Sequence, residues 1–258
     1  MVDKHILKIK KLVHDFGVFR AIDNISLHIE RGSITGLIGP NGAGKTTLFN
    51  LIAGDLRPRS GRIALDDTDV TGLDPEKLFL KGLGRTFQIP RPFSRMSVLE
   101  NVMLAPKGQR GEKLIGPFFS RKFVKNQENL IRKRAMEVID FMTLAPLADH
   151  PAGKISGGQM KLLELARVLM GDPQVILLDE PAAGVNPTLA ETLIRKIEEL
   201  NRGGKTFLII EHDMDFIMGH CKTIIALTQG QVVFEGTPEQ AQSNKLLLDA
   251  YLGANEDV

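Results

Sequence analysis

Hydrophobic and polar residues follow different periods in different parts of the chain, and these periods predict its elements. In residues 6–30 the apolar residues come in short, β-branched, partly alternating bursts, which is typical of half-buried antiparallel strands. The runs 175–178 and 207–210 are continuously apolar, as parallel strands covered on both faces are, and a helical pattern lies between them. Within about 90–165, long helical patterns are broken by Pro and Gly. The pattern predicts an α/β fold with an antiparallel β subdomain and an inserted α-helical subdomain at about 90–165, and the length allows one large domain over 1–258 or two small ones.

The composition is that of a folded protein without a general affinity for polyanions. With 258 residues, 43% of them hydrophobic and 25% charged, the chain can bury a large core. Lys and Arg number 33 against 31 Asp and Glu, a formal net charge of +2, so the charge balance predicts no nucleic-acid partner. The single cysteine, Cys221, excludes an intramolecular disulfide. The N-terminal residues are charged at short intervals and no apolar run is long enough to span a bilayer, which predicts a cytoplasmic location.

One segment departs from this neutrality. Residues 107–134 hold nine Lys and Arg but only two Glu, a local net charge of +7. Such a cluster is either an ordinary solvated helical face, or a contact with phospholipid headgroups or with an acidic loop of a membrane partner. Both interpretations stay open at the level of the sequence.

The strongest local signal is the segment 39–47, Gly-Pro-Asn-Gly-Ala-Gly-Lys-Thr-Thr, which follows a strand pattern and opens a helical one. It matches the phosphate-loop pattern G-x-x-x-x-G-K-[ST] in the context which that pattern requires. Glycines let consecutive backbone N–H groups converge on one anion, and the helix that begins near Lys45 adds the positive end of its dipole. We expect Lys45 to reach the β- and γ-phosphates of a nucleotide and Thr46 to offer its hydroxyl to Mg²⁺. The residues of the expected nucleotide site in this loop are Gly39, Pro40, Asn41, Gly42, Ala43, Gly44, Lys45, Thr46 and Thr47.

A pair of acids follows the apolar run 175–178. Asp179 and Glu180 would lie at the tip of a strand. There an aspartate next to a phosphate loop can hold Mg²⁺ through water, and a neighbouring glutamate can polarise the attacking water. Two adjacent acids at a strand end are in other proteins merely solvated. The phosphate loop in the same chain favours the catalytic interpretation.

Three further segments carry polar residues in a distinctive order. The segment Ser156-Gly157-Gly158-Gln159 stands directly before a helical pattern, Gln88 follows a short strand pattern, and His212 follows the apolar run 207–210. Ser156 is by itself explained as a helix N-cap. A cap does not require the two glycines after it, however, whereas a helix start that receives a γ-phosphate gains from bare backbone. Each segment alone is explained as ordinary structure, but their order and spacing together indicate a shared function.

In these five motifs the chain resembles the nucleotide-binding domain of ATP-binding cassette (ABC) proteins over practically its whole length. The resemblance implies a P-loop NTPase (RecA-like) core, with ATP and Mg²⁺ as cofactors. It also implies two such domains packed head to tail, each ATP lying between the phosphate loop of one and the Ser-Gly-Gly-Gln of the other. In this sequence, Thr46, Gln88 and Asp179 would surround Mg²⁺. Glu180 would be the general base, and His212 would hold the γ-phosphate and the lytic water. The contacts to the ATP of the opposite subunit would come from Ser156, Gly157, Gly158 and Gln159.

Two positions depart from the family pattern. The aromatic residue that stacks on adenine is often Tyr in the family; here Phe16 fits best, although Phe19 lies close by. Where many members have an aspartate in the loop after the catalytic glutamate, this chain has Asn186 followed by Pro187. That pair is a good helix N-cap with proline at the first helical position. A capping role therefore explains Asn186 as well as communication between the two sites does.

A finer resemblance is to the ATPase subunits of branched-chain amino acid importers. It is based on the segments 85–90 and 180–187 and on the basic insertion. It implies uptake of branched-chain or other neutral amino acids, a second ATPase subunit that is identical or paralogous, integral membrane permease subunits, and indirectly a solute-binding protein. The chain would then be peripheral at the inner face of the plasma membrane. Urea and amide importers are similar in these segments, and an export ATPase for lipid or lipopolysaccharide is the other alternative.

The segment 89–93, Ile-Pro-Arg-Pro-Phe, directly follows Gln88 and combines two stiff prolines with an aromatic residue and a cation. Because proline fixes φ, a displacement at Gln88 would pass along this segment instead of being absorbed. One alternative is a Pro-rich turn that joins the core to the helical subdomain. The hypothesis that we prefer is a groove around Phe93 that receives a short cytosolic helix of a permease subunit.

Overall fold

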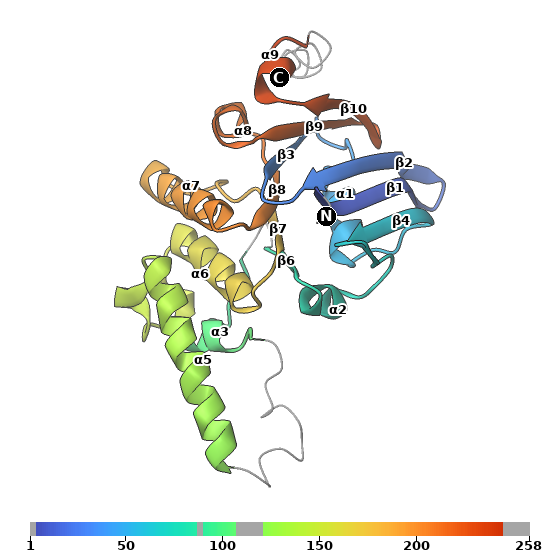
Figure 1. The fold of residues 1–258 in the computed structure, drawn as a ribbon. Coiled ribbons are helices and arrows are strands. Elements are labelled where there is room, and N and C mark those ends of the chain that lie inside the picture. The colour runs from blue at the N-terminus through green and yellow to red at the C-terminus, as the bar shows by residue number, and fades with distance from the viewer. Residues whose placement is uncertain (1–3, 87–89, 107–120, 245–258) are drawn as a thin grey trace. The chain divides into compact units, whose positions relative to one another are not determined.

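The computed structural model describes residues 4–86, 90–106 and 121–244. The chain divides into two compact units, and Figure 1 shows their helices and strands. The first unit comprises 1–85, 174–182 and 197–258, and the second comprises 86–173 and 183–196. Each unit therefore combines segments that are distant in the sequence.

A four-stranded antiparallel sheet belongs to the first unit and has the strand order β2-β1-β4-β5. Its strands are β1 (His5–Phe16), β2 (Phe19–Glu30), β4 (Ser60–Leu65) and β5 (Thr68–Asp69). β1 and β2 pair as far as Phe16 opposite Phe19, so a two-residue turn closes this hairpin. Leu7, Ile9 and Leu12 of β1 are fully buried. The half-buried antiparallel strands predicted from the pattern of residues 6–30 are therefore present.

A six-stranded mixed sheet, also in the first unit, has the order β10-β9-β3-β8-β7-β6. Its strands are β3 (Ile34–Ile38), β6 (Leu83–Arg85), β7 (Val175–Asp179), β8 (Thr206–Ile210), β9 (Thr223–Thr228) and β10 (Gln231–Gly236). Neighbouring strands are parallel, except that β10 is antiparallel to β9. Every residue of β3, β7 and β8 is buried, which explains their continuous apolar sequences. Because these three strands are parallel neighbours, the residues that follow them meet at one edge of the sheet.

The first unit also contains the helix that follows the phosphate loop. Within the described residues, its helices are α1 (Lys45–Ala53), α2 (Pro75–Leu80), α8 (Met214–His220), α9 (Pro238–Gln242) and the last part of α7 (Pro187–Arg202). α1 ends at Gly54, whose φ of 83° is a left-handed conformation that glycine adopts without strain. Leu48, Phe49 and Ile52 of α1 belong to the same hydrophobic core as Leu7 of β1. The core thus anchors the helix behind the phosphate loop.

The described part of the second unit is mainly helical. Its helices are α3 (Val98–Met103), α5 (Arg121–Phe141), α6 (Gly157–Met170) and the first part of α7 (Pro187–Arg202). Ser97 with Glu100 opens α3, and Ser156 with Gln159 opens α6, each pair as a capping box in which both side chains satisfy a backbone N–H of the other residue. None of the helices within the described ranges has the length and hydrophobicity that crossing a bilayer requires. The α/β fold class is confirmed, and the interpretation of 90–165 as an inserted subdomain stays a prediction.

Candidate functional site

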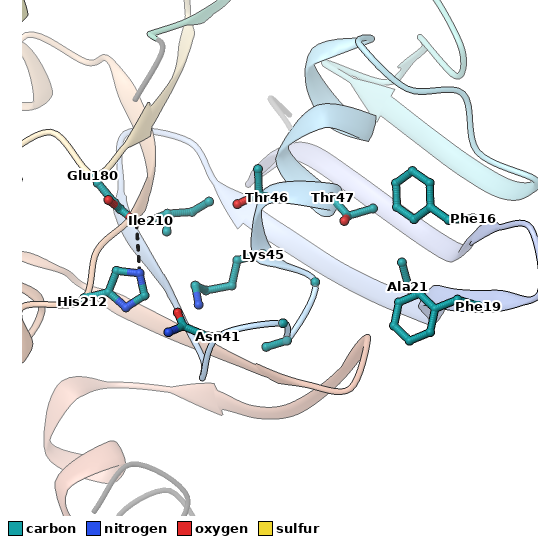
Figure 2. Close-up of a pocket in the computed structure, with 13 residues that line it drawn as sticks. Phe16, Phe19, Ala21, Asn41, Lys45, Thr46, Thr47, Glu180, Ile210 and His212 are labelled. Carbon is teal, nitrogen blue, oxygen red and sulfur yellow. Dashed lines mark ion pairs between the residues drawn. The ribbon is translucent and has the colours of Figure 1, made fainter. Parts of the chain in front are cut away.

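A pocket of about 300 Å³ opens in the first unit. It lies where the loop between β3 and α1, the ends of β7 and β8, and the β1–β2 hairpin come together (Figure 2). The residues that line it are Phe16, Phe19, Ala21, Asn41, Gly42, Ala43, Gly44, Lys45, Thr46, Thr47, Glu180, Ile210 and His212. The structure therefore brings most of the predicted phosphate loop together with Glu180, His212 and Phe16.

The loop between β3 and α1 follows a path that only glycine permits at two positions. Gly39 has a φ of 152°, and a Cβ there would lie 2.3 Å from the carbonyl oxygen of Leu227. Gly44 has a φ of 100°, and its Cβ would lie 2.8 Å from the carbonyl oxygen of Ala21. Backbone oxygens in strands cannot give way as a flexible side chain does, so both positions require glycine. The path leads to the start of α1, where free backbone N–H groups and the helix dipole favour an anion.

Lys45 supplies a buried positive charge to the pocket. It is only 7% exposed, and its Nζ donates hydrogen bonds to the carbonyl oxygens of Gly39 at 2.5 Å and of Pro40 at 3.0 Å. Burial lowers the pKa of Lys45, while the carboxylates of Glu180 and Asp179 act in the opposite direction. A phosphate anion that entered the loop would therefore find its counter-charge already in place.

Asp179 ends β7 and is buried. Its Oδ2 lies 3.4 Å from Nη2 of Arg85 at the end of β6, and Nη1 of Arg85 bonds Asn50 at 2.7 Å and Asp55 at 2.6 Å. Arg85 thus partly compensates the buried charge of Asp179 and ties the end of β7 to α1. In the sequence, the position of Arg85 at the end of a short strand pattern is the only signal for this role.

Glu180 and His212 follow neighbouring parallel strands, and their side chains meet. Oε1 of Glu180 lies 3.0 Å from Nε2 of His212, and Figure 2 shows this pair in the same pocket as Lys45. Glu180 has a φ of 47°, a left-handed conformation that costs a residue other than glycine about 1 kcal/mol. Its N–H donates to the carbonyl oxygen of Ile210 at 2.9 Å. A carboxylate paired in this way with an imidazole can accept a proton from water and hold that water in place.

Two aromatic rings line the pocket on the side of the β1–β2 hairpin. Phe16 and Phe19 are cross-strand partners and are 50% and 62% exposed. The ring of His14 meets that of Phe16 edge to face at 4.7 Å between centroids, which restricts the orientation of Phe16. Because both phenylalanines line the pocket, the geometry leaves the choice of the adenine-stacking ring open.

The segment Ser156-Gly157-Gly158-Gln159 lies in the second unit and opens α6. Ser156 is the N-cap, and its Oγ accepts from the N–H of Gln159 at 3.3 Å. A Cβ on Gly158 would lie 2.8 Å from Leu189, whereas a Cβ on Gly157 would meet no atom within 4 Å. A side chain at Gly158 would therefore force the side chains of Leu189 and Val185 to shift, whereas the backbone of Gly157 has open space around it.

Asn186 caps α7, which is one of the two roles that its sequence context predicts. Its Oδ1 accepts a hydrogen bond from the N–H of Leu189 at 2.9 Å, and Pro187 is the first residue of the helix. Gln88, the third expected ligand of Mg²⁺, lies outside the described residues, as do residues 107–120 of the basic segment.

A buried carboxylate that no sequence motif marks lies next to the catalytic candidates. Glu211 is 4% exposed, and its two oxygens accept hydrogen bonds from the N–H groups of Ala182 at 2.9 Å and of His212 at 3.1 Å. The only sequence signal for it is a charged residue that directly continues an apolar strand pattern.

A glycine-dependent loop before a helix, two acids at the tip of a parallel strand and a histidine at the tip of the next strand define a P-loop ATPase. The model of the ABC transporter family matches residues 22–183. The chain therefore belongs to the ABC transporter family, which confirms the resemblance drawn from its motifs, and it is an ATPase of that family.

Curated relatives match the chain over nearly its whole length. It is 38% identical to a probable branched-chain amino acid transport ATP-binding protein, LivG, of Methanocaldococcus jannaschii, covering 96% of this chain and 97% of that protein. It is 36% identical to the high-affinity branched-chain amino acid transport ATP-binding protein LivG of Escherichia coli, with 96% and 98% covered. The corresponding protein BraF of Pseudomonas aeruginosa is 35% identical, with 98% and 99% covered.

Solved structures give the same family. A crystal structure of an ATP-binding cassette of an ABC transporter in its ADP conformation has a TM-score of 0.84 and 37% identity, covering 97% of this chain and 100% of that chain. A dimeric structure of a bacterial ABC transporter cassette has a TM-score of 0.74 and 27% identity, with 90% and 98% covered.

Proposed function

We propose that this chain is the ATP-hydrolysing subunit of an ABC importer that takes up branched-chain or other neutral amino acids through separate permease subunits. The observation that carries the enzymatic part is one pocket containing Lys45 and the paired Glu180 and His212. The names of relatives that match over nearly the whole chain support the solute class.

In this proposal the phosphate loop holds the triphosphate through its backbone N–H groups and through Lys45. The bonds from Nζ to the carbonyls of Gly39 and Pro40 exchange for bonds to β- and γ-phosphate oxygens, which are stronger because both partners are then charged. Phe16 or Phe19 stacks on the adenine, since both line the pocket with exposed rings.

Mg²⁺ fits the donor groups near the start of α1. Thr46 offers a hydroxyl and Asp179 a carboxylate, and hard oxygen ligands of this kind, completed by phosphate oxygens, are those that Mg²⁺ takes. Gln88 would be the third protein ligand. When bound, the ion would neutralise negative charge on the phosphates. Arg85, 3.4 Å from Asp179, would keep that carboxylate oriented.

Glu180 acts as the general base and His212 as the group that holds the γ-phosphate and the attacking water. The 3.0 Å separation of the two side chains lets the imidazole orient the carboxylate. The left-handed backbone of Glu180, bonded to Ile210, fixes the direction of the side chain before substrate arrives. Such preorganisation lowers the barrier to proton transfer.

We infer further that the cassette functions as a dimer, identical or paralogous, in which Ser156, Gly157, Gly158 and Gln159 contact the ATP of the opposite subunit. A dimeric cassette among the structural neighbours supports the dimeric state. Gly157 has the open backbone that such a contact needs, while Gly158 has a packing role in its own subunit as well.

The coupling surface in this proposal is centred on Phe93, in the second unit. Its ring is 53% exposed and lies 5.8 Å from the guanidinium carbon of Arg167, which is within cation–π distance. Nη1 of Arg167 also donates to the carbonyl oxygen of Arg91 at 3.3 Å. An exposed aromatic ring on a segment held by hydrogen bonds is able to bind a short helix of a permease. In this proposal the chain lies at the cytoplasmic face of the membrane, and a solute-binding protein acts on the permease.

Two substitutions separate nucleotide binding from hydrolysis. Lys45→Ala should keep the circular dichroism spectrum and lose most ATP affinity, because the loop loses its only side-chain cation. Glu180→Gln should bind Mg-ATP normally and lose roughly 10²- to 10⁴-fold in kcat. Calorimetry and phosphate release measure both effects, with Glu128→Gln on the exposed surface of α5 as the matched control.

Unchanged ATP affinity in Lys45→Ala would refute the phosphate-loop assignment. Near-normal turnover in Glu180→Gln would show that another residue is the general base, with His212 as the next candidate.

The solute class is tested in proteoliposomes that contain the chain with its permeases and binding protein. We expect ATP-dependent uptake of leucine. Uptake of urea in its place would assign the chain to the other importer class.

A further inference from the structure

The two catalytic candidates stand on separate loops, and neither is fixed by burial of its own side chain. Glu180 follows β7 and His212 follows β8, and their side chains are 20% and 46% exposed. The strand pairing holds the two loops together as far as Asp179 opposite Ile210. Because the pairing of β7 and β8 ends there, contacts of the two loops themselves must help to hold Oε1 of Glu180 and Nε2 of His212 at 3.0 Å.

Glu211 connects these two loops. One carboxylate oxygen accepts from the N–H of Ala182, two residues after Glu180, at 2.9 Å, and the other accepts from the N–H of His212 at 3.1 Å. The residue is 4% exposed, so these bonds form with little competition from water. Hydrogen bonds from N–H groups to a carboxylate are roughly twice as strong as bonds between neutral groups.

The contacts around His212 limit its movement from both sides. Its own N–H is held by Glu211, and the next residue, Asp213, caps α8 by accepting from the N–H groups of Asp215 and Phe216. On the other loop, the N–H of Glu180 is held by β8, and Glu211 holds the backbone two residues later. The strained φ of Glu180 is thus enclosed between two hydrogen bonds.

We propose that Glu211 is a positioning residue of the ATPase reaction. Its carboxylate joins the loop that carries Glu180 to the loop that carries His212 through two hydrogen bonds, and so sets the separation of the two side chains. The inference rests on the roles proposed above for Glu180 and His212. Both oxygens are needed because each takes one N–H. Glutamine keeps the shape but turns an amide NH₂ toward one of these N–H groups, and aspartate is one methylene too short to reach both.

Steady-state ATPase assays of Glu211→Gln and Glu211→Asp in the purified chain test this positioning role. We expect kcat to fall about 10- to 100-fold while KM for ATP stays within about 2-fold, because misplacement by an ångström costs turnover and the phosphate loop is untouched. Glu198→Gln is the matched control, since it removes a carboxylate of the same unit that pairs with His220 at 2.9 Å. Its kcat should equal that of the wild type.

A double-mutant cycle distinguishes positioning from general stability. In a His212→Ala background, Glu211→Gln should lower the residual kcat by less than about 2-fold, because residues that act through one another are not additive. The same fold-loss in both backgrounds, a raised KM with kcat unchanged, or a wild-type kcat would each overturn the proposal. If Glu211→Gln lacks a native circular dichroism spectrum, Glu211→Asp decides by the same readouts.

The single variants keep the two proposals apart. Glu180→Gln and His212→Ala with normal turnover would refute the proposed catalytic roles, whatever Glu211 does. Loss of turnover in both of these variants, together with normal turnover in Glu211→Gln, would refute only the positioning role of Glu211.

Discussion

Asn101→Ala is expected to loosen the segment that presents Phe93. Asn101 lies in α3 with no exposed surface, and its amide makes four hydrogen bonds with the preceding backbone. Oδ1 accepts from the N–H of Phe93 at 2.8 Å, and Nδ2 donates to the carbonyl oxygens of Phe93, Met96 and Ser97 at 3.1, 3.4 and 2.9 Å. One side chain therefore organises an irregular segment.

The expected magnitude follows from what each partner keeps after the substitution. The carbonyls of Phe93, Met96 and Ser97 retain N–H donors, from Met96 at 3.0 Å, Ala152 at 2.8 Å and residue 101 itself at 3.0 Å. The N–H of Phe93 loses the acceptor that Asn101 supplied. A fully buried donor left without its acceptor costs about 1–3 kcal/mol, and because this hydrogen bond is only partly buried we take the lower end, about 1 kcal/mol. For a chain of this size that lowers Tm by about 2–4 °C.

Thermal unfolding followed by circular dichroism measures the effect, with Asn129→Ala on the exposed surface of α5 as the control. Phe93→Ala is the companion variant. Its half-exposed ring contributes little to Tm, and basal ATPase should persist, whereas stimulation by the permeases should fall. A Tm of Asn101→Ala equal to that of Asn129→Ala would refute the reasoning about the segment, and intact stimulation in Phe93→Ala would place the coupling surface elsewhere.

Two further predictions concern ionisation. Hydrogen bonds from Lys222 and Lys4 lower the pKa of Glu30 from 4.5 to about 2, so its contribution to stability is complete above pH 4.5 and is lost as the pH falls toward 2; the difference in Tm between wild type and Glu30→Gln should shrink over that range. Burial, with a smaller effect of Glu211, raises the pKa of Cys221 to about 12, so the thiol should react with an aromatic disulfide reagent at pH 8 only after denaturant is added. Rapid reaction of the folded protein would contradict this.

The phosphate loop could be predicted from sequence because its chemistry is local. Glycines, Lys45 and Thr46 are contiguous, and the flanking strand and helix patterns supply their context. The meeting of Glu180 with His212 follows less directly, since it depends on β7 and β8 being neighbours in the sheet. The motif order supplied that information through the family resemblance, and the register of Asp179 opposite Ile210 shows its physical basis.

The sequence could not distinguish between Phe16 and Phe19, and the structure explains the ambiguity. A two-residue turn makes them cross-strand partners, so the fold brings both rings to the same pocket. Arg85, Asn101 and Glu211 were beyond sequence reasoning for a different reason. Their partners are main-chain groups or side chains reached only through tertiary contacts, and no spacing in the sequence encodes such a contact.

These missed residues share a physical property that the predicted ones lack. About half of His212 and of Phe93 is exposed, as the proposed contacts with a ligand and a partner require, so burial of their own side chains does not fix them. Glu211 and Asn101 lie within the protein, and both hold backbone next to the residue that is presented. A buried polar group that bonds main chain has a defined geometry and tolerates little change, because losing a partner leaves desolvated groups unpaired. Substitutions at His212 and Phe93 should therefore change chemistry or coupling with little effect on stability, whereas those at Asn101 should change stability first. Glu211 is buried like Asn101, but its substitution should lower turnover as that of His212 does. The double-mutant cycle between Glu211 and His212 therefore tests its role more directly than a measurement of stability does.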